Sequence, residues 1–119
     1  MKDEGSIFMA IYQHTRLASN QSLYISGQTP MKANQTPKDI ETQLDNVLEK
    51  IGFLLEENRL TVNELVKLTI YITDVSYLGA VRAKLAAFIG EPKPTATLVV
   101  VAGLIDPDFK VEIDGIASL

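Results

Sequence analysis

Alternating hydrophobic and polar positions predict several short strands. In "LVKLTIYIT", residues 65–73, apolar and polar side chains take turns, as on a strand with one face buried. The apolar face holds Val66, Leu68, Ile70 and Ile72, and the polar face holds Lys67, Thr69, Tyr71 and Thr73. Strands are also expected in "FMAIYQHTRL" and "LYISG", which a turn joins into a hairpin, and in "TATLVVVA" and "FKVEIDGIA".

Apolar residues at helical spacing predict two helices. The first begins at Thr36-Pro37, because threonine can cap a helix and proline suits the first helical position, and it ends near Asn58. Its apolar face holds Ile40, Leu44, Val47, Leu48, Ile51 and Leu55. The second helix follows a cap at Asp74 or Ser76, and its apolar residues are Leu78, Val81, Leu85 and Phe88.

The elements follow one another in the order ββαβαββ. This order predicts an α+β fold, an α/β sandwich in which one mixed sheet carries two helices on one face. Residues 7–119 are expected to form a single domain after a flexible tail at residues 1–6. Residues 98–101 are apolar on both faces of their strand, so they need a second cover that two helices cannot provide. We therefore expect copies of the chain to pack their open sheet faces together.

Composition and charge exclude several classes of function. The chain has 119 residues, no cysteine, a net charge of −4 and a pI of about 4.9. Disulfides, zinc–thiolate sites and cysteine nucleophiles are therefore excluded, and the scattered Lys and Arg residues make no basic surface for nucleic acid. No spacing of carboxylates predicts a metal site, and no apolar run is long enough to span a bilayer. We expect a cytoplasmic protein with no metal, nucleic-acid or membrane partner.

Two places in the chain are candidates for chemistry. Glu112 and Asp114 lie two residues apart on a predicted strand, so both carboxylates point to the same face. Such a pair can do acid–base work when one pKa is raised, although a solvated polar face is the more common explanation of this spacing. Gly27 ends a strand and opens a loop, where backbone N–H groups can meet a ligand. The single histidine, His14, and Ser26 lack the motif that a serine hydrolase requires.

Four segments together resemble the Rid family, the reactive intermediate deaminases also called YjgF proteins. "YISGQTP" is similar to the family's V-S-G-Q-x-P, and "DIETQLDNVLEKIGFLLEE" is similar to its helix motif D-I-x-x-Q-x-x-x-x-L-x-N. "TVNELVKLTIYITDV" resembles S-x-x-D-V-V-K-x-x-V-F-x-x-D, and "FKVEIDGIA" resembles V-E-I-E-A-I-A. The resemblance runs from about Tyr12 to Ala117, nearly the whole chain.

The resemblance implies a chorismate-mutase-like fold and a homotrimer with clefts for small metabolites between its subunits. Family members with deaminase activity hydrolyse reactive enamines and imines, such as 2-aminoacrylate, to a keto acid and ammonia, and they need no metal or cofactor. In these members an arginine in a P-x-R-[ST] setting holds the substrate carboxylate. A glutamate on the last strand is proposed to position or activate the attacking water.

Carried over residue by residue, the catalytic glutamate falls on Asp114, with Glu112 retained beside it. The ligand-binding positions fall on Tyr12, Ser26, Gly27, Gln28 and Ala96. Ala96 stands where active members have the arginine, and alanine can supply neither orientation nor affinity for a carboxylate. The resemblance therefore argues against ordinary imino-acid deamination, unless Arg16 or Lys93 replaces the missing cation.

Three functions follow from these observations. The chain could be a Rid-type hydrolase for an imine or enamine, with water as the nucleophile. It could instead be a trimer that binds a small metabolite without chemistry. Endoribonuclease activity, assigned to some family members, is the third, and the acidic charge argues against it.

Overall fold

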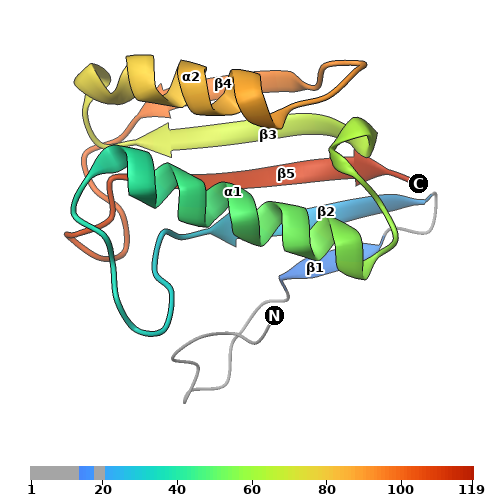
Figure 1. Ribbon diagram of the computed structural model, residues 1–119, viewed down its shortest axis with the longest axis horizontal. Helices are drawn as coiled ribbons and strands as arrows, with labels where there is room; N and C mark the ends of the chain where they lie inside the picture. The colour runs from blue at the N-terminus through green and yellow to red at the C-terminus, as the bar shows by residue number, and fades with distance from the viewer. Residues whose placement is uncertain (1–13, 18–20) are drawn as a thin grey trace.

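The computed structural model describes residues 14–17 and 21–119, which form five strands and two α-helices (Figure 1). The strands are β1 (Thr15–Leu17), β2 (Ser22–Gln28), β3 (Leu65–Ile72), β4 (Thr95–Val100) and β5 (Val111–Ser118). The α-helices are α1 (Ile40–Glu57) and α2 (Leu78–Phe88), and two 3-10 turns are η1 (Val62–Glu64) and η2 (Val75–Tyr77). The predicted tail at residues 1–6 and most of the predicted first strand lie outside the described residues.

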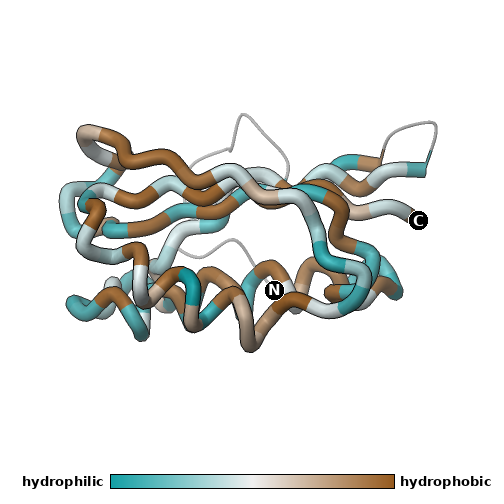
Figure 2. Tube along the Cα trace, turned by 90° about the horizontal axis from the view of Figure 1, so that it is seen from above, coloured by the Kyte–Doolittle hydropathy of each residue, from teal (hydrophilic) through white to brown (hydrophobic). Residues whose placement is uncertain are grey.

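One mixed sheet carries both helices on the same face. Its strand order is β1-β2-β5-β3-β4, and the β3–β4 pair is parallel while the other pairs are antiparallel. Figure 2 shows α1 and α2 together below the sheet, and α1 packs against β2 and β5. The predicted α+β architecture is therefore confirmed. We call the sheet face opposite the helices the open face.

The apolar face of β3 differs from the predicted one at its first residue. Leu65 is 2% exposed and joins the core, whereas Val66 is 44% exposed. The pairing with β5 shifts between Leu65 and Lys67, so Val66 is the extra residue of a β-bulge. The prediction that Val66 faces the core is wrong, because simple alternation cannot include a bulge. Leu68, Ile70 and Ile72 are buried as predicted.

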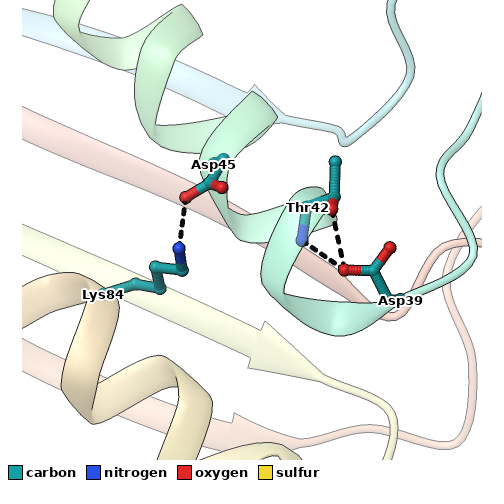
Figure 3. Close-up of polar contacts among 4 residues, drawn as sticks. All are labelled: Asp39, Thr42, Asp45 and Lys84. Carbon is teal, nitrogen blue, oxygen red and sulfur yellow. Dashed lines mark hydrogen bonds and ion pairs between the residues drawn. The ribbon is translucent and has the colours of Figure 1, made fainter.

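Helix α1 begins three residues later than Thr36-Pro37, so that part of the prediction is wrong (Figure 3). Asp39 is the N-cap, and its Oδ2 accepts hydrogen bonds from the backbone N–H and the hydroxyl of Thr42, at 2.9 and 2.7 Å. A carboxylate here satisfies an unpaired donor and also opposes the positive end of the helix. The predicted end near Asn58 is confirmed, since Asn58 is the C-cap.

Helices α1 and α2 are joined at their surface by an ion pair. Lys84 Nζ of α2 lies 2.8 Å from Asp45 Oδ1 of α1 (Figure 3). Asp74 caps η2, and α2 itself begins afterwards at Leu78. Below this pair the predicted apolar face of α1 is largely buried against the sheet, through Leu44, Val47, Leu48, Ile51 and Leu55.

Strand β4 forms one edge of the sheet and leaves apolar side chains exposed. Val99 is 37% and Val100 is 52% exposed. The chain thus presents the uncovered apolar strand from which association of copies is predicted. Over the residues that the structure describes, no helix is long and apolar enough to cross a membrane.

Candidate functional site

Glu112 and Asp114 lie together on the open face of β5. Val111 and Ile113, which alternate with them, are fully buried beneath the helices. Across the sheet Glu112 is paired with Tyr71 of β3, and Asp114 is paired with Thr69. The prediction that the two carboxylates share one face is therefore confirmed.

Gly27 makes room for the carboxylate of Glu112. A Cβ built on Gly27 would overlap Glu112 Oε2 and lie 2.9 Å from Glu112 Cδ. Gly27 belongs to β2 itself, at a bulge where Ser26 and Gly27 together oppose Asp114. The expectation that Gly27 ends the strand is wrong by one residue, since β2 continues to Gln28. Glycine is needed here because a side chain would displace Glu112.

Tyr71 is a member of the site that the sequence analysis did not identify. Its hydroxyl donates a hydrogen bond to Asp114 Oδ2 at 2.9 Å, from β3 to β5. The alternation of β3 places Tyr71 on the polar face, but only the strand pairing brings it to Asp114. We call Gly27, Tyr71, Glu112 and Asp114 the carboxylate site.

The environment of the carboxylate site shifts two titrations. Burial raises the pKa of Glu112, and the neighbouring charge of Asp114 raises this pKa further. The hydrogen bond to Asp114 raises the pKa of Tyr71, and burial adds to the effect. The site therefore combines a carboxyl group that keeps its proton to higher pH with a carboxylate that accepts a tyrosine hydroxyl. A carboxyl group with a raised pKa beside a second carboxyl group is typical of acid–base sites.

Ser26 and Gln28 hold the bulge of β2 through hydrogen bonds. Ser26 Oγ donates to the carbonyl of His14 at 3.2 Å, and Gln28 Nε2 donates to the carbonyl of Ser26 at 3.0 Å. Gln28 Nε2 also lies 3.3 Å from His14 Nδ1. Gln28 is only 2% exposed, so its side chain supports the backbone around Gly27. The ligand-binding roles that the resemblance implies for Ser26 and Gln28 stay predictions.

Ala96 lies on the sheet face opposite the two carboxylates. In the parallel register of β3 and β4, Ala96 is paired with Leu68, which is 1% exposed in the helix-covered core. Paired residues of neighbouring strands share a face, so the structure does not bring Ala96 together with Glu112 and Asp114. Tyr12 lies outside the described residues.

The two cations proposed to replace the arginine lie at the margins of the sheet. Arg16 is exposed and is paired with Tyr24 on the open face, with β2 between it and β5. Lys93 is exposed on the loop before β4 and lines a groove of about 470 Å³ with Val66 and Thr95. Neither residue is adjacent to the carboxylate site in the strand pairing.

Gln43 of α1 fixes the two loops that lead to the site. It is fully buried, and its Nε2 donates to the carbonyls of Pro37 and Asp108 at 2.7 and 2.8 Å. Its Oε1 accepts the backbone N–H of Lys110 at 2.8 Å, two residues before Glu112. The residue pattern does not predict this role, although Gln43 occupies the glutamine of the motif D-I-x-x-Q. Its burial among loop carbonyls could not be foreseen from spacing.

The described residues contain no group of three or more histidine, aspartate or glutamate side chains arranged to hold a metal ion. The chain also contains no cysteine. What the described arrangement offers is proton transfer through carboxyl and phenol groups.

The sequence and the fold are similar to those of known proteins. A family model described as Endoribonuclease L-PSP matches residues 7–119. A RutC family protein of Pyrococcus horikoshii is 35% identical over 98 residues, 80% of this chain and 77% of the relative. A 2-iminobutanoate/2-iminopropanoate deaminase of Escherichia coli is 31% identical over 96 residues, 77% of this chain and 75% of the relative.

A solved structure supports the same relationship over the whole chain. RidA from an Antarctic Psychrobacter bacterium superimposes with a TM-score of 0.87 at 26% identity, covering 100% of this chain and 97% of that chain. The Rid resemblance inferred from the four sequence segments is thus confirmed by both sequence and fold. The chain belongs to the Endoribonuclease L-PSP family, which includes the RidA and YjgF proteins.

Proposed function

We propose that the chain hydrolyses a small imine or enamine to a carbonyl compound and ammonia at the carboxylate site. The observation that carries this proposal is the arrangement of the carboxylate site: Glu112 lies against Gly27, and the neighbouring Asp114 accepts a hydrogen bond from Tyr71. The name of the Escherichia coli relative, an imino-acid deaminase, supports the same reaction class. We also propose a cytoplasmic location, with which a chain that contains no cysteine is compatible.

The two carboxyl groups divide the proton transfers between them. An enamine first becomes an imine when its carbon takes a proton from solvent and its nitrogen loses one. Asp114, held by Tyr71, accepts a proton from water as the water oxygen bonds to the imine carbon, and Glu112 gives its proton to the imine nitrogen. Asp114 then returns its proton to the nitrogen of the resulting carbinolamine, Glu112 takes the hydroxyl proton, the C–N bond breaks and ammonia leaves. One water is consumed, and both carboxyl groups return to their starting states.

A raised pKa suits Glu112 to the acid role. Burial favours the protonated form, so Glu112 keeps its proton to a higher pH than an ordinary glutamate does. Asp114 lies two residues after Glu112 on the same face of β5, and it accepts a hydrogen bond from Tyr71. A phenol donor stabilises the charged carboxylate and orients it for the water.

We further propose that the active form is a homotrimer with the carboxylate site between subunits. The open face carries exposed apolar side chains, among them Tyr24 at 47% and Val99 at 37% exposure. A neighbouring subunit on this face would cover these side chains and exclude bulk water from Glu112. Exclusion of water strengthens electrostatic interactions within the site.

A metabolite-binding trimer without chemistry is the alternative, and the observation that favours it is Ala96 at the family's arginine position. Binding of a metabolite without turnover would raise the melting temperature but release no product. The family description also names endoribonuclease activity. Cleavage of RNA by the purified protein, abolished by Asp114→Asn, would favour that third function over ours.

The test is keto-acid release from freshly generated 2-iminobutanoate or 2-aminoacrylate, with Ala96→Arg run beside the natural protein. Our proposal expects the natural protein to accelerate release over the spontaneous rate. Release by the variant alone would mean that the carboxylate site is intact and that the natural protein binds a different ligand there. Absence of release from both proteins would favour the binding alternative.

A further inference from the structure

Lys67 is the cation that the strand pairing places nearest to the carboxylate site. It lies on the open face of β3, two residues before Thr69, and Thr69 is paired with Asp114. Its ammonium nitrogen donates a hydrogen bond to Thr69 Oγ1 at 3.3 Å. Among residues 14–17 and 21–119, no carboxylate forms an ion pair with Lys67.

Lys67 and Tyr71 are the two diagonal neighbours of Asp114 on β3. Diagonal neighbours on paired strands lie about 7–8 Å apart at Cα, within reach of long side chains. Tyr71 uses this reach to bind Asp114 directly. Lys67 instead donates a hydrogen bond to the hydroxyl of Thr69, which lies between Lys67 and Tyr71 along β3. The ammonium group and the carboxylates therefore border one patch of the open face.

This arrangement leaves Lys67 able to bind an anion. A lysine ammonium has three N–H donors, and Thr69 engages one of them. Thr69 also holds the long side chain in place, which lowers the entropy lost when a ligand binds. A ligand carboxylate beside Asp114 would otherwise meet like charge, so a cation at this position decides whether such a ligand binds.

The other two candidate cations are less well placed for this task. Arg16 is separated from β5 by the whole of β2, with Tyr24 as its pairing partner. Lys93 lies outside the sheet, before the edge strand β4. Lys67, in contrast, is on the strand that pairs directly with β5.

We propose that Lys67, positioned by Thr69, binds the carboxylate of a small imino-acid substrate, with the imine carbon directed toward Asp114. This inference rests on the proposed function and deepens it, because it assigns the carboxylate-binding role to β3 in a chain that has Ala96 on β4. It makes Lys67 a specificity-determining residue. A neutral imine of the same size would then be a poorer ligand than the imino acid.

The experiment measures binding of two stable product analogues, 2-oxobutanoate and uncharged butanone, by calorimetry or NMR titration. We expect the natural protein to prefer 2-oxobutanoate, and Lys67→Met to weaken that affinity about tenfold or more without changing the affinity for butanone. Lys67→Arg keeps the charge and should recover most of the loss. Arg16→Gln and Lys93→Met, which remove the other two cations, should leave the affinity for 2-oxobutanoate unchanged.

Several results would overturn the inference: no preference for 2-oxobutanoate in the natural protein, equal affinity in Lys67→Met, or a loss in Arg16→Gln or Lys93→Met instead. If Lys67→Met does not fold, the inference is still tested by the preference of the natural protein for 2-oxobutanoate over butanone and by the affinity of Lys67→Arg for 2-oxobutanoate. Failure of the proposed function looks different. In that case 2-oxobutanoate would bind in a Lys67-dependent way while no imine is hydrolysed.

Discussion

The hydroxyl of Tyr71 on β3 donates a hydrogen bond to Asp114 Oδ2 on β5 at 2.9 Å, although the residue paired directly with Tyr71 is Glu112. This diagonal hydrogen bond distinguishes the two carboxyl groups chemically, because Asp114 accepts it while Glu112 lies against Gly27. The acid and base roles proposed for the two groups depend on that difference.

Tyr71→Phe removes the donor and keeps the ring. We expect kcat for imine hydrolysis to fall by at least about tenfold and up to about a hundredfold, because a hydrogen bond to a charged group contributes about 1.5–3 kcal/mol and 1.4 kcal/mol is a factor of ten. Stability should change by about 1 kcal/mol or less, since the ring and its packing are kept. Steady-state kinetics and urea unfolding check the two parts. Equal kcat in both proteins would remove Tyr71 from the mechanism.

Gly27→Ala places a methyl group where Glu112 Oε2 lies. The carboxylate is the end of a flexible side chain and can move aside, so the fold should survive while activity falls about tenfold or more through misplacement of Glu112. Gly103→Ala is the matched control, because nothing lies within 4 Å of its Cβ position. Kinetics and melting temperatures of both variants check this. Full activity of Gly27→Ala would show that the Glu112 position is unimportant.

Glu112 makes stability depend on pH in a direction that can be worked out. Its pKa is raised in the folded protein, so between the ordinary value of 4.5 and the raised value the folded state binds more protons than the unfolded state. Stability from this group is therefore present at low pH and lost as pH rises through that window.

Glu112→Gln removes the titration. We expect the variant to have the higher melting temperature above the window and to lose this advantage as pH falls below 4.5. Glu91→Gln, at an exposed loop position, serves as the control. A melting-temperature difference between the natural protein and Glu112→Gln that stays constant with pH contradicts the assignment.

Gln43→Leu should destabilise the protein by about 2–4 kcal/mol, because it leaves the N–H of Lys110 and two loop carbonyls without their partner in a buried place. Urea unfolding measures the change. Gln35→Leu, at an exposed position of the loop before α1, should change stability by less than about 0.5 kcal/mol. A loss below about 1 kcal/mol for Gln43→Leu would mean that water replaces the side chain at little cost.

Periodicity predicted the parts of this fold that depend on burial alone. The alternation of β3 and β5 follows from one buried face, so Leu68, Ile113 and the outward position of Asp114 could be predicted. Residues whose role depends on an irregularity could not. The bulge at Val66 reverses its face, and the cap at Asp39 depends on a local hydrogen bond to Thr42.

Roles that depend on strand order could not be predicted from the pattern of residues along the chain. Tyr71 and Lys67 become site residues only because β3 pairs with β5, which no local pattern specifies. Likewise, the resemblance aligned Ala96 with a site residue, while the strand register places it beside the buried Leu68. Sequence patterns describe faces of single strands, and a site built across strands needs the topology.

Imine hydrolysis by the carboxylates of β5 can be tested through a single variant. The rate of 2-oxobutanoate formation from 2-iminobutanoate generated in solution is compared between the natural protein and Asp114→Asn, with folding of both checked by circular dichroism. We expect acceleration over the spontaneous rate by the natural protein and a loss of at least about a hundredfold in the variant. Equal rates in the two folded proteins, or no acceleration by the natural one, would contradict it.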